Sequence, residues 1–161
     1  MNEVILICSF GIGIVAGLRS MTAPAVVSWT GHVGWLGLSN GPFWFMATVP
    51  AVLILTPWSL FELVIDKTSK IGNRTELLGL GFRIVTSSFS GAAVSSAAGA
   101  DLAIGMVSGL FGGMIGTFGG YYLRRACVRN STLGDLPIAI GEDIIAIGLG
   151  AGCVYIAGGF A

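Results

Sequence analysis

The chain has 161 residues, of which 54% are hydrophobic and only 10% are charged, and its formal net charge at pH 7 is zero. A soluble domain carries about 25% charged residues, so this composition excludes an ordinary soluble protein. The zero net charge gives no indication of a nucleic-acid partner, and we predict none.

Uncharged runs of the sequence are long enough to cross a bilayer. They cover residues 20–61, 102–123 and 144–161, and runs of about 18 or more apolar residues are typical of membrane helices. We therefore predict one all-α integral membrane domain over residues 1–161, a polytopic bundle of about five spans plus a short re-entrant or interfacial helix. The predicted spans are 4–18, 43–65, 77–98, 102–123 and 136–156.

Between the first two predicted spans, residues 20–42 are apolar but are broken by Pro24 and several glycines. They are too interrupted for a regular span, so we expect a short helix over 23–29, either re-entrant or lying in the membrane interface. Residues that suit the headgroup level surround it, namely Trp29, His32, Trp35 and Trp44.

The basic residues predict the orientation. They gather in two connections, with Lys67, Lys70 and Arg74 in the first and Arg124, Arg125 and Arg129 in the second. Cytoplasmic loops carry an excess of lysine and arginine, so both connections are expected in the cytoplasm. With five spans, this predicts a cytoplasmic N-terminus and a C-terminus on the outside.

Ionisable residues inside or at the edge of the predicted spans are the strongest functional signal: Glu62, Asp66, Arg83, Glu142 and Asp143. A charge at the bilayer centre costs about 2.5 to 3.5 kcal/mol on insertion scales, so such residues usually pair or serve a function. Glu62 and Asp66 are four residues apart and share one helix face. Arg83 lies about 9 Å along its span, at 1.5 Å per residue, and Glu142 and Asp143 lie at a similar depth.

Two interpretations of these five residues compete. In the first, Arg83 neutralises Glu142 or Glu62, and the charges hold the bundle together. In the second, the carboxylates line a cytoplasm-facing vestibule and bind a cation or a proton. The acids outnumber the arginine, which favours the second interpretation, although no ligand spacing identifies a metal.

Arg19 is expected to stand apart from this group, at the outer end of the first span. With the start of the following short helix, it would form a point that attracts anions. Alternatively, it extends to the lipid headgroups. We count Arg19 among the candidate substrate- or ion-binding residues.

The fourth span contains two rows of glycines at four-residue spacing, namely Gly105, Gly109 and Gly113, and Gly112, Gly116 and Gly120. Such rows allow helix backbones to approach closely. The partner is either the small-residue third span of the same chain or a second copy. Because five short spans enclose little volume, we expect a homo-oligomer, with a dimer favoured.

Short motifs spread over most of the chain support a family resemblance. They are 17–24 (GLRSMTAP), 62–67 (ELVIDK), Arg83 and 141–143 (GED). In this order they resemble the domain-of-unknown-function family 4126, a family of small bacterial membrane proteins. The resemblance implies a multi-pass protein of the bacterial inner (plasma) membrane with no assigned activity. It also implies that the family's characteristic polar positions are Arg19, Glu62, Asp66, Arg83, Glu142 and Asp143.

Three functions remain open. The first is a small transporter or channel-like protein whose carboxylates bind a cation or a proton. The second is a non-catalytic scaffold or accessory subunit that packs through the glycine-rich span, and the third is a protein that binds or flips an anionic lipid. The sequence has no nucleophile motif and no His/Cys cluster, so we predict no enzyme and no cofactor. The predicted partners are the bilayer, a second copy of the chain, and a small ion or solute.

Overall fold

The computed structural model describes residues 2–65, 77–130 and 135–160, and these residues form helices and no strand. The all-α prediction is therefore confirmed for the described part of the chain. Its six α-helices are α1 (Asn2–Leu18), α2 (Thr22–His32), α3 (Val49–Ile65), α4 (Leu77–Ala97), α5 (Leu102–Asn130) and α6 (Asp135–Gly158). Two short 3-10 helices, η1 (Leu38–Asn40) and η2 (Trp44–Ala47), lie between α2 and α3.

The second predicted span, 43–65, begins later than expected. Residues Trp44–Ala47 form η2, and α3 starts at Val49. Pro50 explains this start, because proline lacks an N–H and fits best in the first turn of a helix. The predicted helix over 23–29 is longer than expected and forms α2, a full helix beside α1.

Within the described residues, two helices are long and apolar enough to cross a membrane. They cover Leu102–Arg129 and Pro137–Gly158, and two shorter apolar helices cover Asn2–Leu18 and Val49–Val64. Large apolar side chains are exposed on the outer helices, among them Trp58, Phe61, Phe111, Ile115, Ile144 and Tyr155. Many large exposed apolar side chains are typical of a protein that contacts a membrane or another protein.

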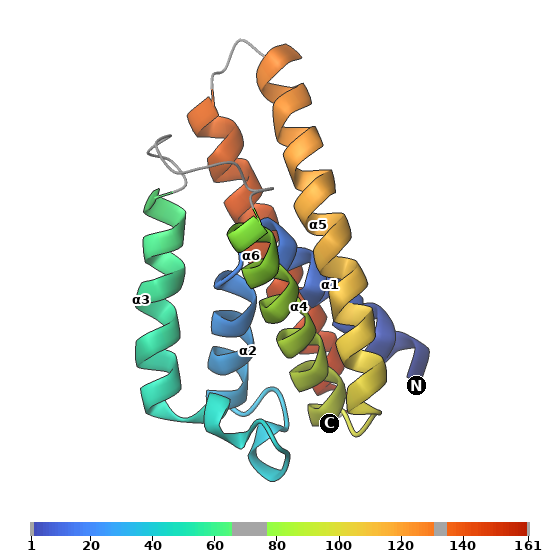
Figure 1. The fold of residues 1–161 in the computed structure, drawn as a ribbon. Coiled ribbons are helices and arrows are strands. Elements are labelled where there is room, and N and C mark those ends of the chain that lie inside the picture. The colour runs from blue at the N-terminus through green and yellow to red at the C-terminus, as the bar shows by residue number, and fades with distance from the viewer. Residues whose placement is uncertain (1, 66–76, 131–134, 161) are drawn as a thin grey trace.

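Helix α1 lies at the centre of the bundle and packs most extensively on α5, then on α4 and α6 (Figure 1). Helix α3 is peripheral and packs chiefly on α2 and η2. The start of α1 and the end of α6 lie at the same end of the bundle, whereas α3 ends and α4 begins at the opposite end. Five spans would put the two chain ends on opposite sides, so this arrangement differs from the predicted topology.

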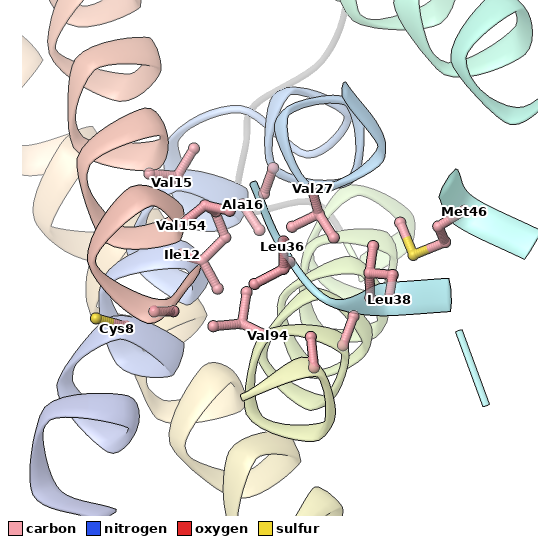
Figure 2. Close-up of a cluster of buried hydrophobic side chains, with 14 of the residues drawn as sticks. Cys8, Ile12, Val15, Ala16, Val27, Leu36, Leu38, Met46, Val94 and Val154 are labelled. Carbon is pink, nitrogen blue, oxygen red and sulfur yellow. The ribbon is translucent and has the colours of Figure 1, made fainter. Parts of the chain in front are cut away.

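The apolar core lies where α1, α2, α4 and α6 meet, and residues of the α2–α3 connection cover it (Figure 2). Ile12 and Val15 of α1 contribute the centre, and Val94 and Val154 pack against them from α4 and α6. Leu36 of the connection is buried in the same cluster. This core fixes the end of α1, from which the chain turns into α2.

Both glycine rows of α5 are occupied by helices of the same chain. A Cβ atom at Gly112 or Gly116 would overlap the carbonyl groups of Phe10 and Ile14 in α1. In the other row, a Cβ at Gly105, Gly109 or Gly113 would overlap α4 at Ser95 or Ser87. The close approach is therefore intramolecular, and any dimer would have to use other surfaces.

Candidate functional site

The chain reverses direction between α1 and α2 over three residues, Arg19, Ser20 and Met21, which we call the elbow. Arg19 is fully buried and Ser20 is 5% exposed. The elbow thus leaves the carbonyl end of one helix and the amide end of the next inside the protein. Buried backbone groups of this kind require partners.

The amide end of α2 receives its partner from α3. Met21 occupies the N-cap position and has no capping side-chain hydrogen bond of its own. Instead, Glu62 accepts hydrogen bonds from the N–H of Ser20 at 2.7 Å and of Met21 at 2.7 Å, one on each carboxylate oxygen. A carboxylate at a helix N-terminus is stabilised by both these N–H groups and the helix dipole.

The carbonyl end of α1 receives its partner from α4. Nη1 of Arg83 donates to the carbonyl of Gly17 and, at 2.9 Å, to that of Leu18. Nη2 of the same guanidinium lies 3.9 Å from Oε1 of Glu62. A positive group is therefore at the negative end of α1 and a negative group at the positive end of α2, which matches both helix dipoles.

Arg19 extends from the elbow toward α6. Its Nη2 lies 2.6 Å from Oδ1 of Asp143 and 3.9 Å from Oε2 of Glu142. Arg124 of α5 approaches the same oxygen of Glu142, with Nη1 3.7 Å from Oε2. The prediction that Arg19 stands apart from the acidic residues was wrong, because α1 ends at the level of Glu142 and Asp143, about two turns into α6.

These contacts assemble a charged layer of six residues: Arg19, Arg83, Arg124, Glu62, Glu142 and Asp143. Within the described residues, it holds three arginines and three carboxylates, so the expected excess of acid is not observed there. From the sequence, only Arg83 was expected among the acidic residues. Arg19 was predicted at the opposite end of the bundle, and Arg124 in a connecting loop. Asp66, the remaining candidate, lies outside the described residues.

The charged layer is not uniformly closed. The side chains of Arg19 and Asp143 are 0% and 9% exposed, whereas that of Glu62 is 20% exposed. The layer therefore has a closed half around Arg19 and a more accessible half around Glu62.

Over the described part of the chain, no group of three His, Cys, Asp or Glu residues is arranged to hold a metal ion.

In the described part of the chain, two cavities adjoin this layer. One, of about 300 Å³, lies between α2, α3 and α6, and Thr22 and Ser59 line it below the elbow. Their hydroxyl oxygens lie 3.2 Å apart. The other, of about 210 Å³, lies between α5 and α6, and Arg124 and Glu142 form part of its wall.

Comparison with known proteins identifies the family. A family model described as "Domain of unknown function (DUF4126)" matches residues 6–154, so the chain belongs to this family and the resemblance noted in the sequence is confirmed. No curated protein and no solved structure matches the chain significantly. The matched region includes all six residues of the charged layer.

Proposed function

We propose that this protein is a multi-pass transporter or channel-like protein of the bacterial inner membrane, which exchanges a proton at the charged layer. Its apolar helices α5 and α6 and its exposed apolar side chains support a location in a bilayer. Ionisable side chains buried in such a bundle mark ion or proton pathways in many membrane proteins.

The elbow is the observation that carries this proposal, because α1 ends and α2 begins there inside the protein. In many secondary transporters, substrate and ion sites are built from helix ends that lie within the membrane. The elbow places helix ends of both kinds together, at a turn between two helices. Here Glu62 caps the N–H groups of Ser20 and Met21, and Arg83 binds the carbonyls at the end of α1. A substrate ion or proton that changed either contact would act directly on the angle between α1 and α2.

Glu62 is the residue to which we assign the exchange. It is the most exposed carboxylate of the charged layer, and Arg83 approaches it only to 3.9 Å. A proton on Glu62 would reduce its capacity to accept hydrogen bonds from Ser20 and Met21. Since no multidentate ligand set surrounds Glu62 in the described residues, a proton fits this position better than a metal ion.

Helix α3 is the element that would respond. It carries Glu62 and packs chiefly on α2 and η2, with the 300 Å³ cavity between it and α6. Release of Glu62 would leave α3 held by its packing on α2 and η2 and by two polar contacts to α2, Thr22–Ser59 at 3.2 Å and Trp29–Thr56 at 2.8 Å. We propose that α3 then moves away from the elbow, which opens the cavity toward the charged layer.

Proton flux into liposomes tests this proposal. The purified protein is reconstituted with a pH-sensitive dye inside, and an outward potassium gradient with valinomycin drives proton entry. Glu62→Gln should reduce flux at least tenfold and leave the melting temperature in detergent within a few degrees of the wild type. Glu3→Gln, at an exposed position of α1, is the matched control and should leave flux unchanged.

The result that would overturn the proposal is equally direct. Wild-type flux no greater than that of empty liposomes would exclude a proton pathway. If Glu62→Gln instead lowers the melting temperature sharply in every buffer, Glu62 holds the elbow and has no transport role. The charged layer would then be a structural ion-pair network, and the scaffold function would become the better proposal.

A further inference from the structure

The cavity between α5 and α6 is a second site, separate from the elbow and the half of the charged layer around Glu62. Its inner wall is formed by Leu18 and Gly120, and its outer rim by Leu123 and Ile145. The two rim residues are exposed, at 66% and 64%, so the cavity opens on the outer surface of the bundle. Helix α5 packs mainly on α1 and α4, which leaves this space between it and α6.

The position of the cavity along α5 sets its level relative to a bilayer. From Leu102 to Arg124, the helix rises about 33 Å at 1.5 Å per residue, close to the roughly 30 Å of a hydrocarbon core. Arg124 therefore reaches the level of lipid phosphates when Leu102 lies at the opposite interface. The apolar rim at Leu123 and Ile145 then lies in the hydrocarbon region immediately below it.

The charges at this end favour a negative group. Glu142 lies in the cavity wall, but Arg19 and Arg124 both approach its carboxylate, at 3.9 Å and 3.7 Å. Beyond Arg124, α5 carries two further exposed arginines, Arg125 and Arg129. With Tyr122 and Ala126 they line a separate hollow and not this cavity. They follow Arg124 at the same end of α5, so they add positive charge at the level where headgroups lie.

We propose that this cavity binds one acyl chain of an anionic phospholipid, with the lipid phosphate beside Arg124. The apolar lining accepts the chain, and the guanidinium geometry suits the phosphate oxygens. Bound in this way, the lipid would fill the space between α5 and α6 and stabilise the Arg124 side of the charged layer. This lipid site requires the proposed location in a membrane but does not require proton transport. Either proposal can therefore be refuted without refuting the other.

Two glycines of α6 provide a matched pair of variants. A Cβ atom at Gly141, which lines the cavity, and one at Gly148, which does not, would each meet no atom within 4 Å. Gly141→Leu should therefore fill the cavity without a backbone clash, and Gly148→Leu should add the same bulk on the same helix outside it. Arg124→Gln removes the phosphate contact while keeping the cavity.

The measurement is lipid retention by native mass spectrometry, after reconstitution in equal parts of phosphatidylglycerol and phosphatidylcholine. The wild type and Gly148→Leu should each retain at least ten times as much phosphatidylglycerol as phosphatidylcholine. Gly141→Leu should lose retained lipid, and Arg124→Gln should retain both lipids equally. In addition, phosphatidylglycerol should slow maleimide labelling of Cys127, which lines the same cavity, whereas phosphatidylcholine should not.

Three outcomes would overturn the inference. Equal retention of both lipids by the wild type would exclude headgroup recognition. Undiminished retention by Gly141→Leu would place the lipid elsewhere on the protein. Cys127 labelling that is insensitive to phosphatidylglycerol, in protein that retains the lipid, would also exclude this cavity as the site.

Discussion

Nη2 of Arg19 lies 2.6 Å from Oδ1 of Asp143, and this ion pair joins the end of α1 to α6. Arg83 and Glu62 form a second link at the same level, from α4 to α3. The first pair joins two helices that are distant in sequence, α1 and α6, whereas the second joins the consecutive helices α3 and α4. Both pairs adjoin the elbow.

Asp143→Asn should destabilise the protein strongly, because Arg19 is fully buried and would lose the carboxylate closest to it. Removing one partner of a buried ion pair typically costs about 3 to 5 kcal/mol. The expected result is a fall in melting temperature in detergent at every pH tested, larger than that of Glu62→Gln. Glu3→Gln is the control, and equal melting temperatures for Asp143→Asn and the control would contradict a structural role for the pair.

The helical fold could be predicted well from the sequence because apolar runs and their interruptions mark helix limits directly. The predicted spans 77–98 and 102–123 correspond to α4 and the first part of α5. Helix α5 extends to Asn130 since nothing in 124–130 prevents a helix, and its basic residues only suggested a loop. The residues at which a helix begins and ends depend mainly on the nearby sequence, so the local pattern of apolar and polar residues can predict them.

The partners in the charged layer could be predicted only in part. The shared depth of Glu62, Arg83 and Glu142 follows from counting residues along each helix, and the structure brings these residues to one level. The position of Arg19 depended on whether residues 20–42 cross the bundle. Because that segment is interrupted by glycines, its pattern did not reveal that α2 is a full helix, which packs on α3 and α6.

Exchanging the charges of Glu62 and Arg83 should not restore stability. An isolated ion pair tolerates such an exchange, but Glu62 also accepts from two backbone N–H groups and Arg83 also donates to two carbonyls. The double variant Glu62→Arg/Arg83→Glu would place like charges at both helix ends. Thermal unfolding should show it no more stable than either single variant, and full recovery would mean that the backbone contacts contribute little.

Gly116→Ala should destabilise the monomer by about 1 to 3 kcal/mol, the usual range for overpacking. A Cβ atom there would overlap the backbone of Ile14 in α1, whereas one at Gly119 would meet no atom within 4 Å. Gly119→Ala, three residues along the same helix, is therefore the matched control and should be tolerated. Thermal unfolding in detergent measures the difference, and equal stability of the two variants would argue against the close contact of α1 and α5.

Both ends of the described chain should lie on one side of the membrane, opposite to Arg125 and Arg129. The start of α1 and the end of α6 share one end of the bundle, while α5 ends at the other. Since basic connections face the cytoplasm, cysteines introduced at Asn2 and Gly159 should react with an impermeant maleimide in intact cells. A cysteine in place of Arg129 should react only after lysis. Labelling of Gly159→Cys but not Asn2→Cys would instead support the five-span topology with a cytoplasmic N-terminus.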